Sequence, residues 1–149
     1  MTDSPPPLPH IALVLGIAGL APQVWALLAT LREEDRYIGL AAGYFYAALI
    51  FSFLGGLWWG VAASRKDAPE WLYLAAVVPS LIAFATGIPW MTGAEWPGPS
   101  LGVLGLAIMM SAIVDWTIFR ARLIDLNLWR LRLGLSLGLG AATLLLASR

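Results

Sequence analysis

Asp115 is an acidic residue inside an otherwise apolar run, residues 100–119. A carboxylate near the centre of a bilayer costs about 2.5–3.5 kcal/mol, and such residues often mark ion or proton paths. Arg132 lies at the start of the next apolar run, so a carboxylate–guanidinium pair can form between two neighbouring helices. Two roles stay open for Asp115: a structural ion pair that pins helices together, and an ion or proton site.

Trp58 and Trp59 add two indole N–H donors to the candidate chemistry. Tryptophan supplies aromatic area for a flat ligand, but it also anchors helix ends at the membrane surface. Trp59 follows a row of small residues, so we expect it to face inward. The predicted polar cluster therefore comprises Asp115, Arg132, Trp59 and Ser52. His10, the single histidine, is interpreted as a solvated residue at the start of a helix.

The composition argues against most catalytic and cofactor chemistry. The chain has no cysteine and one histidine, which argues against disulfides, thiolate metal sites and bis-histidine haem within one chain. No nucleophile elbow or phosphate-binding glycine loop is present. The formal net charge is zero, which argues against a nucleic-acid partner. We therefore expect no enzyme, no metal and no cofactor.

The elements that position these residues are membrane-spanning helices. Sixty per cent of the 149 residues are apolar and 12% are charged, which exceeds what a soluble domain of this size can bury. A span needs about 20 apolar residues. Runs of this length predict an all-α integral membrane protein with five spans, at residues 10–30, 38–63, 70–90, 100–119 and 131–147. Residues 1–9 are a proline-rich tail, and the rest forms one membrane domain.

Small residues recur at helical spacing and predict how the spans pack. In lipid, helices associate where small residues let their backbones approach closely. The predicted packing positions are Ala48, Gly55, Gly56 and Gly60 in the second span and Gly134 and Gly138 in the fifth. Pro79, near the middle of the third span, predicts a kink because proline frees the carbonyl four residues earlier. Together these features predict a compact five-helix bundle.

The basic residues of the loops predict the orientation. Cytoplasmic loops carry an excess of Lys and Arg. Six basic residues fall on one side of the predicted spans and three on the other: Arg65, Lys66, Arg120, Arg122, Arg130 and Arg132 against Arg32, Arg36 and Arg149. The richer side is expected to be cytoplasmic, with the N-terminus in the cytoplasm and the C-terminus in the periplasm.

Four segments in order resemble a family of small membrane proteins that includes transmembrane protein 69. They are LGIAGLAPQ (15–23), YAALIFSFLGGLWWG (46–60), VPSLIAF (78–84) and LWRLRLGLSL (128–137), with Asp115 before the last. The most specific is the SFLGG-x-x-WG element at 52–60. The resemblance implies a polytopic helical protein of the bacterial inner membrane, or of mitochondria in eukaryotes. It implies no reaction.

These observations lead to two functional hypotheses. The first is a non-enzymatic accessory, assembly or interaction subunit, whose partners are the lipid bilayer and either another membrane protein or a second copy of the chain. Small-residue faces and very short loops favour it. The alternative is a small-molecule binder or transporter with a Trp/Asp/Arg pocket in the cytoplasmic half of the bundle.

Overall fold

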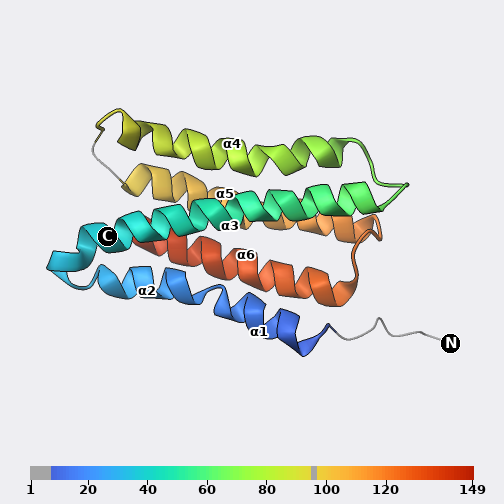
Figure 1. Ribbon diagram of the computed structural model, residues 1–149, viewed down its shortest axis with the longest axis horizontal. Coiled ribbons are helices and arrows are strands. Elements are labelled where there is room, and N and C mark those ends of the chain that lie inside the picture. Colours follow the sequence, from blue (N-terminus) through green and yellow to red (C-terminus); the bar gives the residue numbers. More distant parts are fainter. Residues whose placement is uncertain (1–7, 95–96) are drawn as a thin grey trace.

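The computed structural model describes residues 8–94 and 97–149, and every regular element in this part is helical. The helices are α1 (His10–Ala18), α2 (Ala21–Ala29), the short 3-10 helix η1 (Glu33–Asp35), α3 (Arg36–Ser64), α4 (Trp71–Met91), α5 (Gly98–Arg120) and α6 (Leu126–Ala147). They lie side by side as a bundle (Figure 1). Five helical stretches are long and apolar enough to cross a membrane, as the composition predicts. The first seven residues of the predicted tail fall outside the described part.

The first span is broken, whereas the sequence predicts one continuous helix over 10–30. Helix α1 ends at Ala18 and α2 begins at Ala21. Pro22 has no N–H and cannot extend the helical hydrogen bonding back across this point. The hydroxyl of Tyr46 on α3 donates a hydrogen bond to the carbonyl oxygen of Gly19, which stabilises the break from the side.

The last helix begins five residues before the predicted span, at Leu126 rather than at 131. Asp125 is its N-cap, and the carboxylate accepts a hydrogen bond from the Leu128 amide at 2.7 Å. A side-chain oxygen at this position satisfies an amide that has no partner inside the helix. The other three predicted spans differ from α3, α4 and α5 by one or two residues at each end.

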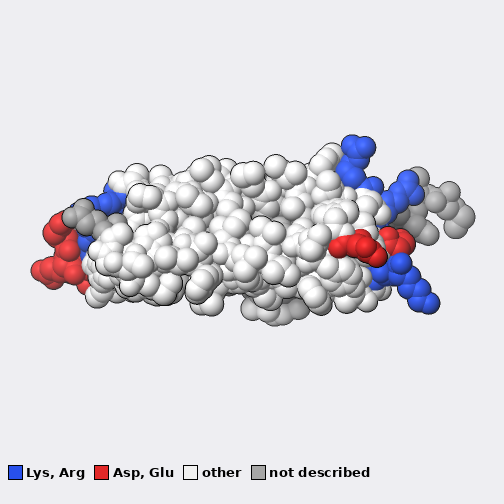
Figure 2. Space-filling model, turned by 90° about the horizontal axis from the view of Figure 1, so that it is seen from above, with Lys and Arg blue, Asp and Glu red and all other residues white. Residues whose placement is uncertain are grey.

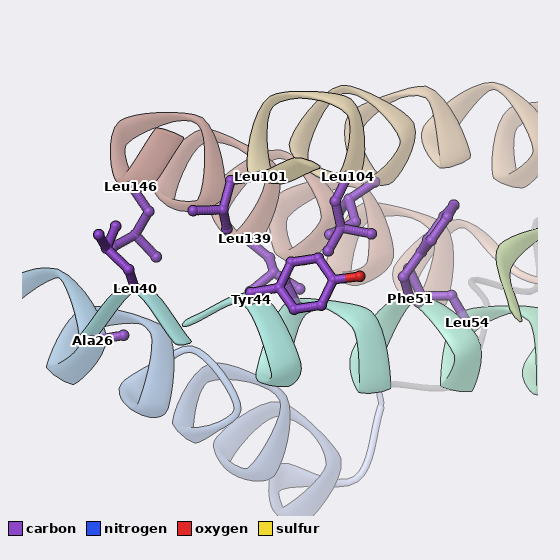
Figure 3. Close-up of a cluster of buried hydrophobic side chains, with 11 residues drawn as sticks. Ala26, Leu40, Tyr44, Phe51, Leu54, Leu101, Leu104, Leu139 and Leu146 are labelled. Carbon is purple, nitrogen blue, oxygen red and sulfur yellow. The ribbon is translucent and has the colours of Figure 1, made fainter. Parts of the chain in front are cut away.

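The main core lies where α3 meets α5 and α6. Its buried side chains come from four helices and include Ala26, Leu40, Tyr44, Phe51, Leu54, Leu101, Leu104, Leu139 and Leu146 (Figure 3). Helix α1 contributes no buried residue. Helix α1 is therefore only loosely packed on the bundle, whereas each of the helices α2 to α6 contributes buried residues.

The outer surface has the charge distribution of a membrane-embedded protein. Lys, Arg, Asp and Glu gather at the two ends of the molecule, and the broad band between the ends carries none on the face shown (Figure 2). Large apolar side chains point outward along this band, including Leu49 (68% exposed) and Leu74 (75% exposed). Water would solvate such a surface poorly, whereas lipid chains suit it.

The predicted packing glycines divide into two groups. A Cβ on Gly55 would overlap the carbonyl oxygen of Ala76, so Gly55 is a true contact between α3 and α4. Gly138 faces Leu20 at ordinary contact distance, and Ala48 packs beside the main core. These three expectations agree with the structure.

The expectation is wrong for Gly56, Gly60 and Gly134, because a Cβ on any of them would meet nothing within 4 Å. A close approach of α5 and α6 instead uses Gly105 and Gly140, whose Cβ positions would lie 3.1 and 2.9 Å from each other's carbonyl oxygens. The uncovered glycines face away from the bundle.

Pro79 lies inside an uninterrupted α4 and is fully buried. Its Cγ would lie 3.2 Å from a Cβ on Gly55. The proline ring therefore packs against α3 at Gly55. The kink predicted at this residue stays a prediction.

Candidate functional site

Asp115 on α5 is the centre of a buried polar cluster. Its side chain is 0% exposed, and that of Arg132 on α6 is 9% exposed. The Arg132 Nε and Nη2 atoms donate to Asp115 Oδ1 at 3.0 and 2.7 Å. The indole Nε1 of Trp58 on α3 donates to the same oxygen at 2.7 Å. Three helices are thus joined through one carboxylate oxygen.

The hairpin of α5 and α6 explains why Asp115 and Arg132 meet. The helices are antiparallel neighbours joined by a short loop, so residues at equal distances from the loop face each other. Ser111 and Ser136, one helical turn further from the loop on each helix, form the next pair, with their hydroxyls 3.3 Å apart. The Asp115–Arg132 pair predicted from the sequence is therefore present in the structure.

The second oxygen of Asp115, Oδ2, is buried and has no hydrogen-bond partner among the described residues. A buried polar atom without a partner costs about 1–3 kcal/mol, and more if it is charged. All three donors approach Oδ1 alone. The cluster therefore keeps one free acceptor inside the bundle.

The tryptophan of the cluster is Trp58, and the expectation that Trp59 would join it is wrong. Trp58 is 3% exposed, whereas Trp59 is 51% exposed and packs edge-on against Tyr73 with their ring centroids 5.0 Å apart. Successive residues of a helix point about 100° apart. Only one of two adjacent tryptophans can therefore reach Asp115.

Ser52 also lies outside the cluster, contrary to expectation. It lines a separate groove between α3 and α4, together with Ala48, Ser80 and Gly87. Ser52 is six residues, more than one helical turn, before Trp58 on α3. His10, as expected, is an exposed residue at the start of α1.

A second buried polar contact was not predicted. Gln23 on α2 donates through Nε2 to the Thr143 hydroxyl on α6 at 3.0 Å, and both side chains are fully buried. Thr143 in turn donates to the Leu139 carbonyl oxygen at 2.8 Å. The sequence contained a feature that predicts this contact. Gln23 is a polar amide inside an apolar run, where it must find a hydrogen-bond partner.

Two adjoining pockets of about 180 and 350 Å³ lie beside the Asp115 cluster. Residues of α1, α3 and α6 line both of them, and Arg132 borders each. Asp115 and Trp58 line the larger one. No group of three His, Cys, Asp or Glu side chains able to hold a metal ion occurs in residues 8–94 and 97–149.

Comparison with known proteins identifies the family. The family model described as "protein of unknown function (DUF3429)" matches residues 8–148, which include every helix and the whole Asp115 cluster. The chain belongs to this family.

A curated relative is transmembrane protein 69 of Xenopus tropicalis, which is 40% identical over 88 residues. The match covers 56% of this chain and 33% of the relative, so the chain spans about a third of that protein's length. No solved structure matches the chain. Family membership thus agrees with a multi-pass membrane protein and assigns no activity.

The two adjacent tryptophans give a matched test of the cluster. Trp58→Phe keeps an aromatic ring but removes a donor to a buried carboxylate, so it should lower the free energy of unfolding by about 2 kcal/mol. Trp59→Phe should change it by less than about 0.5 kcal/mol, because the ring is at the surface. Unfolding in mixed detergent micelles, followed by circular dichroism, measures both. A larger loss from Trp59→Phe would contradict the assignment.

Proposed function

We propose that this protein is a non-enzymatic interaction subunit of the bacterial inner membrane, which binds a transmembrane helix of another membrane protein on its α3–α4 face. The observation that carries the proposal is the uncovered pair Gly56 and Gly60, which have nothing within 4 Å of their Cβ positions. In lipid, exposed small residues let a second helix approach closely enough for dispersion contacts and Cα–H···O contacts.

The same face continues into the groove between α3 and α4. This groove, of about 440 Å³, is lined by Ala48 and Ser52 in the same row as Gly56 and by Ser80 and Gly87 on α4. A second helix could bury small side chains along the whole row, and the serine hydroxyls offer hydrogen bonds across the contact. Very short loops leave little water-exposed surface, so a partner has to bind laterally.

Enlarging Gly56 tests the proposal. A Cβ on Gly56 meets no atom of this chain within 4 Å, so Gly56→Leu should keep the fold while a helix docked on this face is displaced. We expect a partner that co-purifies at fixed stoichiometry in mild detergent to be lost by at least about tenfold, the change that 1.4 kcal/mol produces.

The matched control is Gly102→Leu on α5, where an added Cβ also meets nothing within 4 Å. It should leave co-purification unchanged. Loss of the partner in both variants, or in neither, would refute a role for the α3–α4 face. If the co-purified protein is a second copy of this chain, the α3–α4 face forms a homo-oligomer and does not bind a different membrane protein.

We also propose that the N-terminus is cytoplasmic and the C-terminus periplasmic. Five of the six basic residues assigned to the richer side belong to the loops or helix ends there, and the sixth, Arg132, is paired inside the bundle. The richer side still carries more basic residues than the other.

The absence of cysteine makes this orientation directly measurable. In intact cells, Glu34→Cys should react with a membrane-impermeant maleimide and Lys66→Cys should not, because the two exposed positions lie at opposite ends of α3. Reaction after lysis is the control for both variants. The reverse pattern would invert the proposed orientation.

A second candidate function is small-molecule binding, and a separate observation favours it. The two pockets between α1, α3 and α6 border the Asp115 cluster, and their walls are almost entirely apolar. Buried apolar pockets with a few converging polar groups are the usual form of a ligand site. This candidate is independent of the α3–α4 face.

A further inference from the structure

The two adjoining pockets form one continuous feature, here named the α1/α6 groove. Both pockets are bordered by Gly16 of α1, Phe53 and Leu57 of α3, and Arg132 and Leu135 of α6. Five shared residues mean that the pockets are two ends of the same groove. It runs beside α6 from the Asp115 cluster toward the break between α1 and α2, where Gly19 and Leu20 line the smaller pocket.

The groove opens on the lipid-facing side of the bundle. Phe53 and Leu15, on its two opposite walls, are 61% and 63% exposed. Helix α1, which forms one wall, has no buried residue and is separated from α2 by the break at Gly19. A molecule dissolved in the bilayer can therefore reach the groove laterally, without crossing a charged end of the protein.

The polar residues that line the larger pocket, Asp115, Arg132 and Trp58, determine which chemical groups can bind there. Asp115 lines the larger pocket, and Arg132 and Trp58 both donate to its Oδ1 atom. Its Oδ2 atom has no partner and no exposed surface, so an occupant contacts it only after the side chains that cover it shift. A buried carboxylate oxygen is an acceptor only, so the group that completes it must be a donor. An all-hydrocarbon occupant, such as a lipid acyl chain, would leave Oδ2 unpaired.

The net charge of the Asp115–Arg132 pair favours a ligand with an uncharged hydrogen-bond donor. Asp115 is already paired with the Arg132 guanidinium through two hydrogen bonds, so the pair carries no net charge. An added ammonium or phosphate would place an uncompensated charge in an apolar site, which is strongly unfavourable. A hydroxyl group supplies one donor without a charge.

We propose that the α1/α6 groove binds a neutral, hydroxyl-bearing lipid, with its O–H donating to Asp115 Oδ2 and its hydrocarbon chain lying along Phe53, Leu57 and Leu135. This inference rests on the second candidate function and names the ligand class for it. The occupant enters from the bilayer beside α1.

The test compares two photoreactive probes with the full chain in phospholipid nanodiscs. One is a long-chain alcohol that carries a diazirine in its chain, and the other is its methyl ether, which lacks the O–H donor. At equal mole fraction in the lipid, the alcohol should label the groove saturably and be displaced by unlabelled alcohol. Peptide mapping should place the label on α1, the second half of α3 and the first half of α6. The ether should need about a tenfold higher mole fraction for half-saturation.

Gly16→Leu blocks the groove from within. A Cβ on Gly16 would lie 3.2 Å from Leu135 Cδ1, so a leucine there fills the shared part of both pockets. This variant should abolish labelling at these peptides, whereas Gly102→Leu, at a residue that lines neither pocket of the groove, should not. The comparison of the two probes uses the unchanged chain, so it stands even if Gly16→Leu folds poorly.

Each outcome decides a separate point. Saturable labelling by the alcohol alone supports the inference. Equal saturable labelling by alcohol and ether refutes hydroxyl recognition and leaves small-molecule binding in place. Absence of saturable labelling in the groove refutes both this inference and the second candidate function.

Discussion

Replacing Asp115 with leucine should lower the free energy of unfolding by about 3–5 kcal/mol, the cost of leaving one partner of a buried ion pair without the other. The guanidinium of Arg132 would lose both of its hydrogen bonds to the carboxylate, and its side chain is only 9% exposed. Trp58 would lose its acceptor as well. The single replacement therefore damages the contact of three helices.

The double variant Asp115→Leu/Arg132→Met should recover most of this loss. Replacing both partners of a buried ion pair by apolar residues of similar volume is often neutral or stabilising. The two single variants and the double variant form a cycle, and their coupling isolates the pair from its surroundings. Reversible unfolding in mixed detergent micelles, followed by circular dichroism, supplies the free energies.

The outcome of the cycle also separates the two roles considered for Asp115. If the double variant is as stable as the parent chain, apolar residues stabilise the fold as well as the ion pair does. The charged residues then have a role other than stability, such as offering the free Oδ2 acceptor. A double variant as unstable as Asp115→Leu would show that the charged residues themselves hold the helices together, which contradicts the expected recovery.

The five spans and the Asp115–Arg132 pair could be predicted because each depends on local features of the sequence. Apolar length defines a span. Asp115 and Arg132 are ionisable residues on either side of one short loop, and the antiparallel hairpin leaves few other positions for them. The pairing follows from connectivity and the cost of an unpaired charge.

The inward faces of the helices could not be predicted for a different reason. In a soluble protein the polar face of a helix identifies the side that points away from the core. Helix α3 is apolar all round, because its outer face meets lipid and its inner face meets protein. Trp58 and Trp59, or Gly55 and Gly56, are then equivalent in the sequence and differ only in the structure.

The helix ends depended on single residues that act over one turn. Asp125 starts α6 earlier than the apolar run suggests, because its side chain caps the Leu128 amide. Pro22 and the Tyr46 hydroxyl together break the first span at Gly19. The contact from Tyr46 comes from another helix, so the position of the break could not be derived from residues 10–30 alone.

The adjacent glycines of α3 give the second large expected effect. Gly55→Leu should lower the free energy of unfolding by about 3 kcal/mol or more, at the upper end of the cost of overpacking. A Cβ on Gly55 would overlap the Ala76 carbonyl oxygen and lie 3.2 Å from the Pro79 ring. The obstacle is the backbone of α4, which cannot rotate away as a side chain can, so the two helices must separate.

Gly56→Leu is the matched control, since it makes the same change at the next residue of the same helix. A Cβ on Gly56 meets nothing within 4 Å, so the free energy of unfolding should change by less than about 0.5 kcal/mol. Thermal unfolding of the purified chain in one detergent, measured by size-exclusion chromatography after heating, ranks the two variants. Equal losses would mean that α3 is rotated relative to the arrangement described, and would remove Gly56 and Gly60 from the exposed face. If a membrane protein co-purifies with the parent chain and a stable Gly56→Leu chain loses it, the proposed interaction lies on that face, because the fold itself is unchanged.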